Sequence, residues 1–97
     1  MSIPSFRQVI KPPDVLLQDL EGEAVLLNLA NGQYYGLDQG SYHMYRTLTS
    51  APSIQAAYEA LAQEYEVEPG QLQTDLERFV ADLVNHGPLI FPGRQPA

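Results

Sequence analysis

Apolar and polar positions in the first third of the chain fall into short runs that turn residues separate. Three such runs lie before position 38, at 15–20, 24–29 and 33–37. Glu21-Gly22 divides the first two runs and Asn31-Gly32 divides the last two. Asn-Gly is a strong hairpin signal because both residues tolerate positive φ. The pattern predicts a three-stranded antiparallel meander in which the first and third strands are edge strands.

After Asp38 the apolar residues recur at steps of three and four, which is the period of a helix. A first helix is expected to end near 49–52, with Asp38 or Ser41 as its N-cap. A second is expected over 54–65 with Ser53 as its N-cap, and a third from Pro69 to the stop signal Gly87-Pro88. The fold class predicted is α+β and winged-helix-like, with the three-stranded antiparallel sheet before three helices.

The chain divides into one domain and two flanking segments. Residues 1–14 contain three prolines and no sustained period, so we expect an extended N-terminal arm. The domain is expected over 15–91, and 92–97 are interpreted as a C-terminal tail. A chain of 97 residues suffices for one compact domain with a modest core.

Charge and composition exclude several classes of function. Twelve acidic against five basic residues give a formal net charge of −7, and no cluster of Lys and Arg is present to neutralise phosphates. Nucleic acid is therefore an unsuitable partner. The chain has neither the apolar run of a membrane helix nor a signal peptide at its start, and it has no cysteine. We expect a cytoplasmic protein that binds no membrane.

The sequence contains no catalytic or metal-binding motif. The two histidines, His43 and His86, have neither HxxxH nor HExxH spacing, and no Ser or Thr has the context of an activated nucleophile. The acidic residues of the helices lie scattered, as on solvated faces. We therefore expect no enzymatic activity, no cofactor and no metal.

The third strand and the third helix are the candidate binding elements. Tyr34 and Tyr35 are adjacent in a strand, so they must point to opposite faces; strand propensity and core filling would explain the pair equally well. One flank of the third helix carries Asp75, Phe79, Asp82 and His86. A strand edge beside this flank would suit addition of a peptide as a further strand, and its acids would favour a peptide with Lys or Arg. Tyr35→Pro is expected to abolish such binding by removing a strand N–H.

The ordered whole resembles the PqqD-like family, whose members recognise leader segments of ribosomally made precursor peptides. The resemblance covers residues 15–90, through Leu26-Leu27-Asn28-Leu29, then Asn31-Gly32-Gln33-Tyr34-Tyr35-Gly36-Leu37-Asp38, and the apolar helix positions that follow. It implies a leader bound as an additional antiparallel strand on the third strand, beside the third helix. The leader-binding positions it implies are Gln33, Tyr34, Tyr35, Gly36, Leu37, Asp75, Arg78, Phe79, Asp82, Leu83 and His86.

Within that family a chain of this length is most similar to the stand-alone lasso-peptide B1 proteins, which present the leader to a separate leader peptidase. A PqqD-type chaperone for a radical-SAM peptide-modifying enzyme is the alternative. The partners implied are the precursor-peptide leader and a leader peptidase or other peptide-modifying enzyme. An exposed third strand allows either a monomer or an edge-strand dimer.

Three other functions compete with this interpretation. A winged-helix DNA-binding domain would need a basic recognition helix, whereas the third helix has one Arg against three acids. A small peptidase would need a metal site or an activated nucleophile. A protein-adaptor domain would bind a folded partner through exposed aromatic residues, and its binding would not depend on a leader.

Overall fold

The computed structural model describes residues 7–64 and 68–91 and has three strands followed by three helices. The elements are β1 (Val15–Leu20), β2 (Glu23–Asn28), β3 (Tyr34–Leu37), α1 (Gln39–Ser50), α2 (Ile54–Glu64) and α3 (Pro69–His86). The predicted α+β order is confirmed. The expected end of the second helix at Tyr65 lies outside the described residues.

The strands form one antiparallel sheet in the order β1-β2-β3, so β1 and β3 are its two edges, as predicted. The β1–β2 turn has positive φ at Glu21 and Gly22, and the second hairpin has positive φ at Gly32. The third strand was predicted to begin at Gln33 but begins at Tyr34. Gln33 stays in the turn because its N–H donates to the side chain of Asn31, at 2.9 Å.

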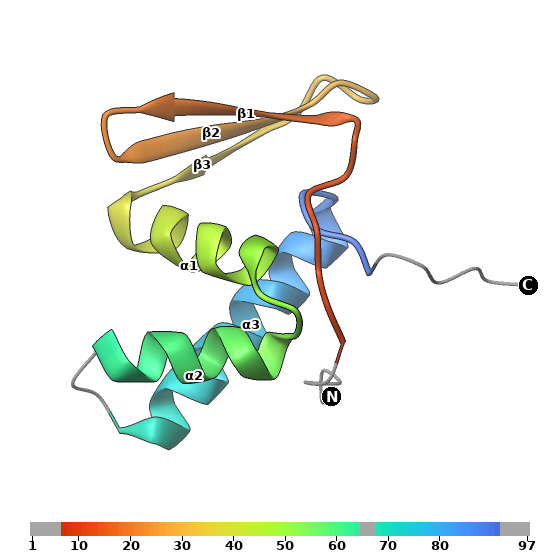
Figure 1. Ribbon diagram of the computed structural model, residues 1–97. Coiled ribbons are helices and arrows are strands. Elements are labelled where there is room, and N and C mark those ends of the chain that lie inside the picture. The colour runs from red at the N-terminus through yellow and green to blue at the C-terminus, as the bar shows by residue number, and fades with distance from the viewer. Residues whose placement is uncertain (1–6, 65–67, 92–97) are drawn as a thin grey trace, which may run out of the picture.

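All three helices lie on one face of the sheet, with α1 directly beneath it and α2 and α3 further away (Figure 1). Of the two predicted caps for α1, Asp38 is the one used: its carboxylate accepts from the Ser41 N–H at 2.8 Å. Ser53 caps α2 in the same way, by accepting from the Ala56 N–H at 3.0 Å. α3 ends at Gly87, whose φ of 110° is the left-handed conformation that favours glycine.

The core fills the space between the inner face of the sheet and the helices. Every helix contributes apolar side chains at the predicted spacing, and the sheet contributes alternate residues. The buried side chains are Val9, Val15, Ala24, Leu26, Leu37, Tyr42, Tyr45, Leu48, Ile54, Ala57, Leu61, Leu72, Leu76, Val80, Leu83 and Leu89. Burial of each large apolar side chain stabilises the fold by about 1.5–3 kcal/mol.

The segments before β1 and after α3 pair with each other. Ile10 and Ile90 form an antiparallel bridge with N–H to O=C distances of 2.9 and 3.0 Å, and Val9 is fully buried. The buried hydroxyl of Tyr45 donates to the carbonyl of Pro88 at 2.8 Å, and burial raises the pKa of that phenol. Residues 1–6 of the predicted arm and the predicted tail 92–97 lie outside the described residues.

None of the helices in the described ranges has the length and apolar character that crossing a membrane requires.

Candidate functional site

The backbone of β3 divides its hydrogen-bonding groups between β2 and the free edge of the sheet. In an antiparallel pair, hydrogen-bonded residue pairs alternate with non-hydrogen-bonded ones. Asn28 donates to the Gln33 carbonyl at 2.8 Å, so on the same register the next hydrogen-bonded pair is Leu26 with Tyr35. The N–H and C=O groups of Tyr34 and Gly36 therefore point to the free edge, where a further strand can pair with them.

This alternation divides the predicted strand-pairing set. Tyr34 and Gly36 present backbone groups at the edge, whereas those of Tyr35 and Leu37 and the carbonyl of Gln33 point toward β2. The N–H of Gln33 donates to the side chain of Asn31. Tyr35→Pro would remove a strand N–H, as expected, but one that points toward β2 rather than toward the edge. Proline at this position would break the pairing of β3 with β2 inside the sheet itself.

The two tyrosines of β3 point to opposite faces of the sheet, as predicted. Tyr34 is 76% exposed on the face that carries no helix among the described residues. Tyr35 is half-buried against the core, and its hydroxyl reaches α3 and donates to Asp82 Oδ2 at 3.1 Å. Leu37, the next inward residue, is buried. One tyrosine thus faces the helices and the other faces solvent.

Tyr35, Asp82 and His86 form a small polar corner between β3 and the end of α3. The rings of Tyr35 and His86 lie with centroids 5.9 Å apart, and His86 Nδ1 lies 2.8 Å from the Asp82 carbonyl oxygen. Partial burial raises the pKa of the Tyr35 phenol. The hydrogen bond that Tyr35 donates to Asp82 and the negative charge of Asp82 raise this pKa further. These contacts tie the edge strand to the C-terminal end of α3.

The other α3 residues that were predicted to bind the leader differ in how exposed their side chains are. Asp75 is exposed and accepts from the Gln71 amide at 2.8 Å, and Arg78 is exposed. Phe79 is half-buried against the core. Leu83, which the resemblance placed among the leader-binding positions, is fully buried in the core of the chain without a ligand.

A small pocket of about 60 Å³ opens beside this corner. Its walls combine predicted residues with several that sequence reasoning missed. The lining residues are Val15, Leu26, Asn28, Gln33, Tyr34, Tyr35, His86 and Pro88. Four of them, Val15, Leu26, Asn28 and Pro88, carried no sequence signal of a site, because only the folded sheet and the segment after α3 bring them together.

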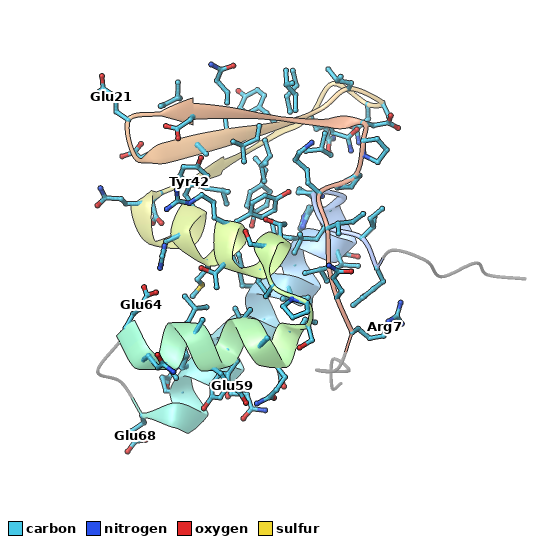
Figure 2. The ribbon with its side chains drawn as sticks, viewed as in Figure 1. Arg7, Glu21, Tyr42, Glu59, Glu64 and Glu68 are labelled. Atoms are coloured by element: carbon cyan, nitrogen blue, oxygen red, sulfur yellow. The ribbon has the colours of Figure 1, made fainter. Side chains whose placement is uncertain are left out.

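The other edge of the sheet, on β1, is partly occupied. The Val15 N–H donates to the Pro12 carbonyl at 3.1 Å, and Lys11 Nζ donates to the Val15 carbonyl. Asp19 points inward and accepts from the Tyr42 hydroxyl at 2.9 Å, which raises the pKa of Tyr42; Figure 2 shows Tyr42 between α1 and the sheet. A covered strand start and an inward-pointing charge both discourage pairing with a further strand.

The other histidine, His43, lies far from this corner. His43 Nε2 is 2.6 Å from Glu64 Oε1, which joins α1 to α2 away from β3. In the described ranges no group of three or more His, Asp or Glu side chains is placed to hold a metal ion.

Comparison with known proteins identifies a family over most of the fold, from β2 onward. The sequence pattern of coenzyme PQQ synthesis protein D (PqqD) matches residues 23–89, which include the whole of β2, β3 and the three helices. The chain belongs to the PqqD family. The resemblance of its sequence to PqqD-like recognition elements is thus confirmed. A search of curated proteins gives no match to the sequence.

Two solved structures share the fold of this PqqD-family chain over most of its length. TbiB1 in complex with the TbiA(beta) leader peptide is 28% identical, with a TM-score of 0.75, over 90% of this chain and 99% of TbiB1. A lasso peptide synthetase B1 complexed with the leader peptide has a TM-score of 0.77 and 23% identity, over 86% of this chain and 98% of that one. Both similar proteins were solved with a leader peptide bound.

Proposed function

We propose that this chain binds the leader segment of a ribosomally made precursor peptide as a fourth strand on the edge of β3. The observation that carries the proposal concerns the described residues: Tyr34 and Gly36 direct their backbone groups to the free edge of β3, near Asp82 of α3. Edge N–H and C=O groups supply affinity in strand addition, and the neighbouring side chains supply selectivity. The 28% identical TbiB1, which covers nearly all of this chain, supports a leader as the ligand.

We also propose that the protein delivers the bound leader to a separate processing enzyme and catalyses no step itself. Similarity to two lasso-peptide B1 proteins favours a leader peptidase as that enzyme. A radical-SAM peptide-modifying enzyme is the alternative, and the match to the PqqD pattern supports it. Both alternatives use the same leader-binding edge and differ in the enzyme that receives the peptide.

Titration of the purified protein with fluorescein-labelled leader and core segments of the precursor peptide encoded beside it tests the first proposal. Leader-selective binding by fluorescence anisotropy is expected. Absence of binding to both segments would overturn leader recognition and favour the adaptor alternative.

Delivery is tested by adding the protein to the candidate leader peptidase and the full precursor. The rate of leader cleavage should rise with this chain and stay at its basal value when Tyr34→Pro replaces the wild type. Equal rates with and without the chain would overturn delivery to that peptidase, while a stimulated radical-SAM enzyme would identify the alternative partner.

A further inference from the structure

The register of β3 identifies which residue of an added strand meets the Tyr35 corner. The residues opposite Tyr34 and Gly36 would form the hydrogen-bonded pairs, so the residue opposite Tyr35 would lie in a non-hydrogen-bonded pair, where side chains are closest. Side chains of directly opposed residues lie on the same face of a sheet. That residue therefore points inward with Tyr35, toward Asp82 and His86 on α3.

Resting on the proposed function, we infer that the leader residue opposite Tyr35 is a Lys or Arg and that the Asp82 carboxylate selects it. Asp82 Oδ2 accepts from the Tyr35 hydroxyl at 3.1 Å. The other oxygen, Oδ1, lies 3.9 Å from His86 Nδ1, which is too far for a hydrogen bond. A carboxylate accepts several hydrogen bonds, so Asp82 retains acceptor capacity for a cation from the added strand.

The surroundings of Asp82 favour a long basic side chain over an acidic or a short one. Its side chain is 54% exposed, so a cation can approach it while remaining partly solvated. The ring of Tyr35 lies on the path from β3 to Asp82 and can pack against the methylene stem of Lys or Arg. The formal net charge of −7 adds a general repulsion against acidic peptides.

The nearest Lys or Arg on the same helix does not take this role. Arg78 lies one turn before Asp82, yet no ion pair joins the two in the part of the chain that the structure describes. The other carboxylate on this flank, Asp75, lies about two turns from Asp82 and accepts from Gln71. Asp82 is thus the acid that contacts β3, and Asp75 provides a matched control.

The test is a double-mutant cycle between the leader and α3. Anisotropy titrations would use the fluorescein-labelled leader of the precursor peptide encoded beside this chain, with each Lys and Arg replaced singly by Gln. One replacement should weaken binding to the wild type by about two- to fivefold, the range for a largely exposed ion pair. The same replacement should have no further effect on Asp82→Asn, whose amide oxygen still accepts from Tyr35.

The controls separate this inference from the proposed function. Asp75→Asn should keep the full effect of the replacement, and Asp82→Lys should bind best to a leader with Glu at the selected position. If wild type binds the leader but every replacement costs the same in wild type and Asp82→Asn, the inference fails while leader binding stands. A leader without Lys or Arg that binds wild type equally tightly would also overturn it. No binding of any leader to wild type would overturn both.

Discussion

β1 and β3 are both edge strands of the same sheet, but they differ in how far their outward backbone groups are covered. At β1 the start of the edge is occupied by Pro12 and Lys11, and Asp19 places an inward-pointing carboxylate near its end. At β3 the edge groups of Tyr34 and Gly36 have no such cover among the described residues, and α3 provides a wall beside them. Two equivalent strand edges thus differ because local side chains protect one of them from pairing.

The comparison also explains why an exposed edge can persist in this protein. β3 is only four residues long, which limits the number of backbone bonds that a wrong partner can form. The side chains near it supply selectivity that backbone pairing alone lacks. On the proposed function, specific binding would depend on the combination of the short open edge with the Tyr35 and Asp82 corner.

The largest expected effect comes from removing an edge N–H at β3. Tyr34→Pro should weaken leader binding by about five- to tenfold, because one lost backbone hydrogen bond costs about 1–1.5 kcal/mol and 1.4 kcal/mol is a factor of ten. Tyr34→Ala retains the N–H and should bind more tightly than Tyr34→Pro. Anisotropy titrations measure both, with circular dichroism to verify folding.

The matched change on the other edge is Leu17→Pro, which removes an N–H that the alternation places on the free edge of β1. A folded Leu17→Pro variant should bind the leader as the wild type does. Equal losses for Tyr34→Pro and Leu17→Pro would show that the edges are not distinguished and would contradict strand addition at β3.

A smaller effect is expected from cutting the tie between the open edge and α3. Tyr35→Phe should lower the free energy of unfolding by about 0.5–1 kcal/mol, because one partly exposed hydrogen bond to Asp82 is lost. Urea unfolding at neutral pH measures this difference. Asp75→Asn, which leaves the Tyr35 contact intact, should unfold close to the wild type.

The same variant gives a signed dependence on pH. The folded-state pKa of Tyr35 is raised, so its contribution to stability is complete below the ordinary tyrosine pKa of about 10 and is lost as pH rises through the raised value. The stability advantage of wild type over Tyr35→Phe should therefore shrink at strongly alkaline pH. An advantage that grows there would contradict the Tyr35–Asp82 bond as its source.

Removing the protection of β1 should make the two edges more alike. The double variant Lys11→Met/Asp19→Leu should self-associate more than wild type, because it frees the Val15 carbonyl and removes the inward charge. Sedimentation measurements over a range of concentrations detect this. Gln18→Leu adds an apolar side chain to the same strand without altering either protecting residue, and it should remain like wild type.

The smallest effect concerns the residue that follows β3. Asp38→Ala should lower the melting temperature modestly at neutral pH, because the N-cap bond to the Ser41 N–H is lost. The backbone hydrogen bond from Ser41 lowers the pKa of Asp38. Its contribution is therefore present above the ordinary carboxyl pKa and is lost as pH falls through the lowered value, so the two melting curves should converge in acid.

The sequence was sufficient to predict the elements because their signals are local. Asn31-Gly32, Asp38, Ser53 and Gly87 each act within a few residues, through positive φ or a capping bond. The site was predicted only in part. Which backbone groups of β3 face outward depends on the register with β2, and the burial of Leu83 depends on the rotation of α3, so neither follows from spacing alone.

The contact between Tyr35 and Asp82 could not be predicted from the sequence either. Both residues were predicted as site positions on separate elements, yet only the packing of α3 beside β3 brings them within 3.1 Å. Asn28 and Pro88 were not predicted as site residues, because they line the pocket only through their position in the folded chain and their residue types indicate no binding role.

The bridge between Ile10 and Ile90 has a consequence for the order of folding. It joins segments near opposite ends of the chain, and contacts so distant in sequence carry a high loop-closure entropy, which favours their formation after the local hairpins and helices. The bonds that cover the start of β1 do not depend on the bridge, because Lys11 and Pro12 lie only four and three residues from Val15. We therefore expect β1 to be protected before the two ends of the chain meet, so that β3 is the edge which a newly synthesised chain leaves open.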